Sequence, residues 1–151
     1  MPPSLRSRSG YSMVELVFLM VVLAGLAAMT WIRIGPALER ARLRGAANTL
    51  ATDLQYAQVL AARYRVPMLV EVDVAAKQYR ISDLSRSTTY RVRELGSAGE
   101  YRLQSITATP ASIQVFPNAI VDQGAQYVLM LNGNQRRVTF SRAGQIRVIA
   151  P

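Results

Sequence analysis

Three hydrophobic patterns follow one another along the chain. Residues 16–32 carry no charged side chain and are mostly apolar. From residue 43 to residue 64, apolar side chains recur at alternate spacings of four and three, which places them on one face of a helix. These positions are Leu43, Ala47, Leu50, Leu54, Ala57, Ala61 and Tyr64. After residue 66, short runs alternate between apolar and polar residues, as in antiparallel strands. The pattern predicts one long helix followed by a β-rich part.

The two apolar helical segments are expected to form a single helix. Gly35 and Pro36 lie between them and should kink or locally unwind it. The helix should run to about Arg65, because Val66 precedes Pro67 and is therefore biased towards an extended backbone. The apolar stripe is expected to pack on a sheet, and a coiled-coil seam is the alternative.

The β-rich part is expected to contain several short strands joined by turns. Asn132, Gly133 and Asn134 form a strong hairpin signal, and residues 142–144 form a second turn. Residues 83–100 and 117–126 are expected to be mainly loops. The candidate strands are residues 68–74, 79–82, 88–93, 101–107, 112–116, 127–131, 136–141 and 145–149.

Composition argues against a catalytic or metal-dependent function. The 151 residues include no cysteine and no histidine, which removes the commonest metal ligands and the commonest general base. Lys77, the one lysine, lies in an expected turn. We therefore expect no catalytic residue, no metal site and no cofactor. A periplasmic enzyme held by an uncleaved anchor remains a less favoured alternative.

The charge is strongly positive, +9 at neutral pH. Residues 127–151 carry Arg136, Arg137, Arg142 and Arg147 and no acidic residue. Clustered arginines favour phosphate groups, so these four are candidate contacts to double-stranded DNA. The alternative is that they only solvate two hairpins.

The N-terminal apolar segment has a carboxylate near its start. Residues 11–32 number 22, roughly 33 Å of helix, against a bilayer core of about 30 Å. Arg6 and Arg8 precede the segment, which predicts a cytoplasmic leader and an exported C-terminal part. An ordinary secretory signal or an ordinary anchor would explain the length. Neither explains Glu15, because a charge in such a segment is costly and marks a functional site.

Residues 10–15, with the sequence GYSMVE, resemble the processing and assembly motif of type IV prepilins. The resemblance implies that prepilin peptidase cuts between Gly10 and Tyr11 and that the new N-terminus at Tyr11 is methylated. It also implies that Glu15 directs assembly. A carboxylate in a dry helix bundle needs a cation, and the N-terminal ammonium of a neighbouring subunit would supply one.

The whole layout resembles an α+β pilin-like fold, with a long N-terminal helix packed on an antiparallel sheet. The expected parts are a leader (1–10), a transmembrane and filament-core helix (11–35), an amphipathic half of the helix (36–65) and a periplasmic head (66–151). Residues 138–146 at the C-terminal end resemble the GspH/FimT-type family of minor pilins and pseudopilins. The resemblance implies a single-pass protein of the bacterial inner membrane that later joins a filament.

Two roles within this family compete. The first is a minor pilin of a type IV pilus, a tip or initiation subunit that could bind DNA for uptake. Some DNA-binding members carry a Gly-Arg-x-Arg motif; here residues 144–147 match it, except for glutamine at position 145. The alternative is a minor pseudopilin of a type II secretion system. Both roles imply other pilin or pseudopilin subunits as partners.

Overall fold

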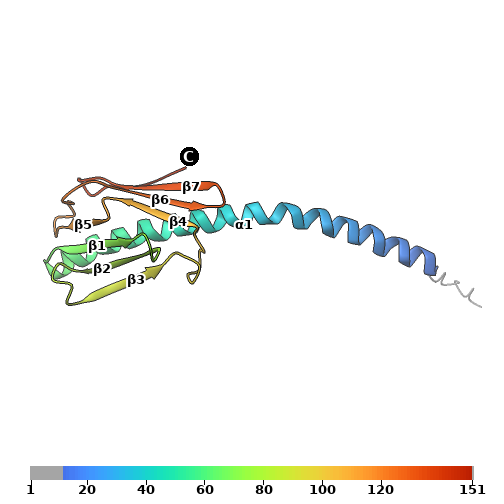
Figure 1. The fold of residues 1–151 in the computed structure, drawn as a ribbon, viewed down its shortest axis with the longest axis horizontal. Helices are drawn as coiled ribbons and strands as arrows, with labels where there is room; N and C mark the ends of the chain where they lie inside the picture. The colour runs from blue at the N-terminus through green and yellow to red at the C-terminus, as the bar shows by residue number, and fades with distance from the viewer. Residues whose placement is uncertain (1–11, 151) are drawn as a thin grey trace, which may run out of the picture. The chain divides into compact units, whose positions relative to one another are not determined.

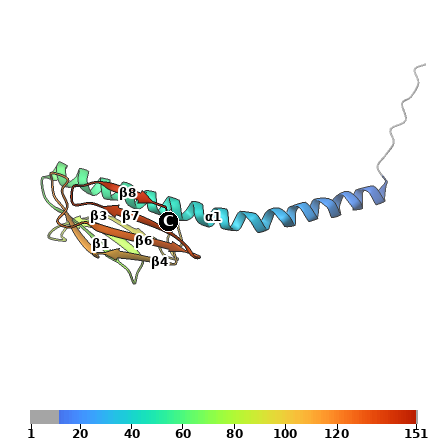
Figure 2. The same ribbon diagram turned by 90° about the horizontal axis from the view of Figure 1, so that it is seen from above.

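The structure, a computed structural model, describes residues 12–150, except for the side chains of residues 29–34. Its one α-helix, α1, spans Met13–Tyr64 and is followed by eight strands in this described part. The strands are β1 (Met68–Asp73), β2 (Gln78–Asp83), β3 (Thr89–Glu94), β4 (Ser105–Thr109), β5 (Ser112–Val115), β6 (Ala125–Leu131), β7 (Asn134–Phe140) and β8 (Ile146–Ile149). Figure 1 labels α1 and β1–β7, and Figure 2 labels β8.

The chain divides into two compact units between Ala37 and Leu38. In the first unit, the side chains of residues 13–28 are all exposed, and most of them are large and apolar. Within the residues that the structure describes, no helix has both the length and the apolar character needed to cross a membrane. The helix continues through Gly35 and Pro36 without unwinding, and a bend at this point stays a prediction.

The second unit contains the rest of α1 and two four-stranded antiparallel sheets. The first sheet has the order β3-β2-β1-β5, and the second has the order β4-β6-β7-β8. Figure 2 shows α1 running along one side of these sheets. The α+β fold with a long helix on antiparallel strands is confirmed, whereas the division into two sheets was not predicted.

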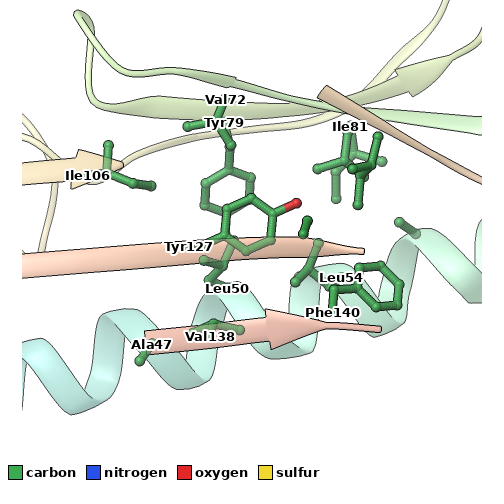
Figure 3. Packing of buried hydrophobic residues seen from close by; sticks show 14 of the residues in the cluster. Ala47, Leu50, Leu54, Val72, Tyr79, Ile81, Ile106, Tyr127, Val138 and Phe140 are labelled. Carbon is green, nitrogen blue, oxygen red and sulfur yellow. The ribbon is translucent and has the colours of Figure 1, made fainter. Parts of the chain in front are cut away.

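The apolar stripe of α1 faces the sheets, as its spacing predicted. Every predicted stripe residue is buried except Tyr64, which stacks on Tyr90 of β3 with ring centroids 5.5 Å apart. Figure 3 shows Leu50 and Leu54 packing against side chains of both sheets, including Tyr79 and Tyr127. Complete burial of one such leucine contributes about 1.5–3 kcal/mol. Packing on the sheets therefore replaces the coiled-coil alternative for this stripe.

One strand expectation is confirmed and one is corrected. The candidate strand at residues 88–93 is present as β3, which lies within the region expected to be mainly loop (83–100) and pairs with β2. The strand expected at residues 101–107 begins only at Ser105. Tyr101 instead packs beside Gly45 of α1, and its hydroxyl lies 2.7 Å from the Thr49 hydroxyl. The β6–β7 hairpin agrees with the sequence: Asn132 and Gly133 both have positive φ and form its two-residue turn.

The turn between β7 and β8 requires glycine. Gly144 has a φ of +80°, and a Cβ atom there would lie 2.3 Å from the carbonyl oxygen of Ala119. The Gln58 side-chain amide donates a hydrogen bond of 2.8 Å to the carbonyl of Gly144. This turn is thereby attached to α1.

Gly144→Ala is expected to lower the free energy of unfolding by about 2–3 kcal/mol. Positive φ alone costs an alanine about 1 kcal/mol, and the clash with Ala119 adds to it. Gly133→Ala is the matched control, because Gly133 has a similar φ of +78° and open space around the same position. Urea unfolding of both variants measures the difference, and equal losses would contradict the role of the clash.

Candidate functional site

The predicted assembly segment is partly described. Gly10 and Tyr11, the predicted cleavage and methylation positions, lie outside the described residues. Glu15 lies in the first turn of α1, is exposed, and has no ion pair with another described residue. Apolar side chains surround it, for example Val14, which is 77% exposed, and Phe18, which is 70% exposed. This stretch of helix presents a lone carboxylate on an apolar surface.

The four C-terminal arginines do not form one cluster. Arg136 and Arg137 are neighbours on β7, so their side chains point to opposite faces. Arg136 shares its face with the buried Val138 and Phe140, which pack in the core. The sequence grouped all four arginines, and the strand alternation separates Arg136 from the others.

Arg137 and Arg147 lie on the outer face of the second sheet. Arg147 pairs in register with Thr139, two residues from Arg137 on the same face of β7, so the two arginines are diagonal neighbours. Both are exposed, and Arg142 is exposed in the turn that joins β7 to β8. The four strands of this sheet contain no acidic residue. The outer face of this sheet is therefore positively charged.

Arg136 contributes to a different feature, which we call the basic hollow. It is a depression of about 230 Å³ between α1, β7 and the end of β8. Arg40 and Arg44 from α1 and Arg136 from β7 supply its charge. The other lining residues are Leu43, Asn134, Gln135 and Ala150. This grouping could not be predicted from the sequence, because Arg136 lies about ninety positions from the two helix arginines and no local pattern connects them.

The described residues also contain a buried ionic cluster, consisting of Asp53, Tyr79, Arg91 and Arg93. Asp53 on α1 is only 1% exposed. Its carboxylate accepts hydrogen bonds from the Tyr79 hydroxyl at 2.5 Å and from Arg93 Nε at 2.8 Å, and it forms a salt bridge with Arg91. Arg91 also lies over the Tyr56 ring, 4.5 Å from its centroid.

This cluster attaches β3 to the helix. No side chain of β3 is fully buried, so apolar packing holds this edge strand only weakly. Asp53 provides an attachment from the helix to both arginines of the strand. Since both carboxylate oxygens already accept hydrogen bonds, the cluster is structural and has no free oxygen positioned for proton transfer. A sequence signal existed: Asp53 lies between Leu50 and Leu54 on the buried stripe.

Burial raises the pKa of Tyr79 well above its ordinary value near 10, and the hydrogen bond to Asp53 raises it further. Burial also raises the pKa of Tyr127. Both tyrosines are therefore neutral in the folded chain at pH values where unfolded tyrosine ionises.

The free energy of unfolding is expected to fall as pH rises above about 10. The folded pKa values lie above the unfolded ones, so this contribution is fully present below the unfolded pKa and is lost above it. Tyr79→Phe should lower stability at neutral pH by about 1–2 kcal/mol and make the alkaline decline shallower. Urea unfolding from about pH 8 to about pH 11 tests this. An unchanged alkaline slope in the variant would contradict the assignment.

No group of acidic, histidine or cysteine side chains within residues 12–150 could hold a metal ion. The arrangement therefore offers surfaces for contact: an apolar helix with one carboxylate, a positive sheet face and a basic hollow. Such features suit binding and assembly.

The comparisons with known proteins agree with this description. The family described as Type II transport protein GspH matches residues 46–144. No curated protein shows significant sequence similarity to the chain. Two crystal structures of the type IV minor pilin FimU from Pseudomonas aeruginosa share the fold. The first has a TM-score of 0.61 and 23% identity over 75% of this chain and 95% of FimU. The second has a TM-score of 0.59 and 21% identity over 72% of this chain and 97% of FimU.

The minor pseudopilin EpsH from the type 2 secretion system of Vibrio cholerae has a similar fold. It gives a TM-score of 0.53 and 15% identity over 73% of this chain and 98% of EpsH. At these identities the structures show the fold alone, whereas the family match extends over more than half of the chain. The chain belongs to the GspH family of pilin-like proteins, which confirms the predicted resemblance to the GspH/FimT-type pilins.

Proposed function

We propose that the chain is a minor subunit of a type IV pilus that assembles through α1. The exposed apolar surface of residues 13–28 carries this proposal, because a helix that is apolar on all sides needs a covering by lipid or by other helices. Membership of the pilin family implies assembly with other pilin subunits. Within that assembly we assign the chain a low-copy role at the tip or in initiation.

The N-terminal motif supports a maturation step before assembly. We propose that the precursor is a single-pass protein of the inner membrane with a periplasmic head, cut by prepilin peptidase after Gly10 and methylated at Tyr11. Glu15 then pairs with the ammonium group of Tyr11 on a neighbouring subunit.

Gly10→Val is expected to leave the precursor uncut, since a side chain at this position would hinder the peptidase. Intact mass spectrometry of the membrane fraction should show a chain that retains residues 1–10 in the variant and begins at Tyr11 in the wild type. A variant chain that still begins at Tyr11 would refute the cleavage assignment.

A minor pseudopilin of a type II secretion system is the alternative role. The family match and the fold shared with EpsH are consistent with it. Deletion of the gene separates the two roles: loss of pili with normal protein secretion supports the pilus role, and loss of secretion with normal pili supports the pseudopilin role. We assign no catalytic activity to the chain, because it lacks histidine and cysteine and both oxygens of its buried carboxylate already accept hydrogen bonds.

DNA binding is a second candidate function, favoured by the outer face of the second sheet. Arg137 and Arg147 are exposed on this face, and Arg142 is exposed in the turn that joins β7 to β8. None of the three has an acidic partner among the described residues. Arginines on an open face can contact phosphates without a fixed motif. Arg136 is removed from this group, because its side chain lies on the other face of β7.

Titration of double-stranded DNA against the full chain in detergent, at several salt concentrations, tests this function. A variant with Arg137, Arg142 and Arg147 changed to glutamine should lose most of its affinity for DNA. The slope of log affinity against log salt concentration should also become shallower, by the amount expected for the loss of about three phosphate contacts. The matched control changes Arg65, Arg80 and Arg102, which are also exposed, to glutamine. Equal loss in both variants would show that only total charge matters.

A further inference from the structure

The proposed function gives no role to the basic hollow. We propose that it receives an acidic side chain from a neighbouring pilin-family subunit in the filament. This inference rests on the proposed function, because it requires the chain to stand beside other subunits. It adds a specific contact on the head to the assembly through α1.

The hollow carries positive charge that the described chain does not neutralise. Arg40, Arg44 and Arg136 line it, and none of them forms an ion pair with another described residue. The acid nearest in sequence, Glu39, is already engaged, since its Oε1 accepts a hydrogen bond of 2.6 Å from the Asn132 side chain. Arg40 and Arg44 are one helical turn apart, a spacing at which like charges repel. A carboxylate in the hollow would relieve this repulsion.

The lining of the hollow suits a carboxylate. Each guanidinium can donate two parallel hydrogen bonds to one carboxylate group. Ala150, which is exposed, adds apolar surface beside the arginines, and such surface strengthens an ion pair by excluding water. The Asn134 side-chain amide, on the same face of β7 as Arg136, provides a further donor. An inserted aspartate or glutamate would have both charge partners and a place for its methylene groups.

A protein partner fits the hollow better than DNA does. Each DNA strand presents a phosphate about every 3.4 Å along the helix axis, so a duplex is matched by cations spread over an open face. The hollow instead gathers three cations around a single depression. Arg40 also follows the first unit by only three residues, and the apolar helix of that unit is the proposed contact with neighbouring subunits. This position in the chain favours another subunit as the source of the acid.

Photo-crosslinking in filaments of the producing bacterium identifies the partner. The full chain carries benzoylphenylalanine at Asn134, which lines the hollow on the same face of β7 as Arg136, or at Gln126 on the outer sheet face as the control. We expect the probe at position 134 to link to an aspartate- or glutamate-containing segment of a pilin-family subunit, and the probe at 126 not to link there. Links from position 134 only to DNA, to lipid or to a segment without an acid would overturn the proposal.

Variants measure the strength of the contact. Arg40→Gln, Arg44→Gln and Arg136→Gln together should reduce the amount of chain in sheared filaments about tenfold, equivalent to about 1.4 kcal/mol. The control with Arg65, Arg80 and Arg102 changed to glutamine should stay within about twofold of the wild type. Arg136→Glu should be rescued when the crosslinked acid of the partner is changed to arginine, and this exchange does not depend on how the triple variant folds.

The outcomes separate the two proposals. If the wild type is present in filaments and the hollow variant is present at the same level, the carboxylate contact is wrong and the proposed function stands. If the wild-type chain is absent from filaments, the proposed function fails, and the contact fails with it.

Discussion

Asp53→Ala is expected to lower the free energy of unfolding by about 3 kcal/mol. Removal of one partner from a buried ion pair typically costs 3–5 kcal/mol, because the remaining charge stays without compensation. One effect makes the loss of stability smaller here: the Arg91 and Arg93 side chains are about one-third exposed, so water can solvate their charges. A second effect makes the loss larger, because the buried hydroxyl of Tyr79 loses its hydrogen-bond acceptor.

The loss of stability in Asp53→Ala should be concentrated in β3. This strand buries no side chain completely, so without Asp53 it is held by its pairing with β2, the stacking of Tyr90 on Tyr64 and the contact of Arg91 with the Tyr56 ring. Hydrogen exchange should therefore show faster exchange in β3 than in β6 or β7 of the same variant.

Two further variants give this prediction its controls. Asp53→Asn keeps an oxygen that can accept the hydrogen bond from the Tyr79 hydroxyl. Its free energy of unfolding should fall by less, about 1–2 kcal/mol. Asp73→Ala, at an exposed aspartate that bonds only the amide of Ala76 among the described residues, should lose less than about 1 kcal/mol. Urea unfolding measures all three. A loss below about 1 kcal/mol for Asp53→Ala would contradict the role assigned to the cluster.

Glu15→Ala is expected to reduce incorporation into filaments at least tenfold. The side chain is exposed on α1 among apolar residues, so its removal should not disturb the head, whose buried core begins at Leu43. The loss has a different cause: the variant can no longer neutralise the ammonium group that a neighbouring subunit would bring into a dry helix bundle. A buried ammonium group without a partner is costly, and assembly would stop at this step.

Processing separates this effect from a failure of maturation. The variant should still be cut after Gly10, because the side chain at position 15 is not at the cleaved bond. Western blots of sheared filaments and of membranes should show mature variant chain in the membrane fraction only. Glu94→Ala, at an exposed acid on β3, is the control and should appear in filaments as the wild type does. Normal incorporation of Glu15→Ala would contradict the pairing.

Local patterns in the sequence predicted the helix and the last hairpins well. The stripe from Leu43 to Ala61 recurs with the period of a helix, and every member is buried. Asn132 and Gly133 adopt the positive φ that their turn requires. These features depend on neighbours within a few residues, so a pattern along the chain contains the necessary information.

Features that depend on distant residues could not be predicted in the same way. The arrangement of the strands in two sheets depends on which distant strands pair, for example β1 with β5. The candidate strand at residues 88–93 is confirmed as β3, but its attachment to the helix could not be predicted, because it comes from an ion cluster with Asp53 rather than from apolar alternation. Arg136 was grouped with its neighbours in sequence, while its partners in the basic hollow come from α1. Each of these features depends on a contact between residues that are far apart in the sequence.

The proposed function requires that the chain be a processed pilin-like subunit that enters a filament through its N-terminal helix. The intact mass of the chain recovered from sheared filaments of the producing bacterium tests this. We expect a chain that is present in the filament, begins at Tyr11 and carries one added methyl group. A chain that retains residues 1–10, or one that is found in the membrane and never in the filament, would contradict it.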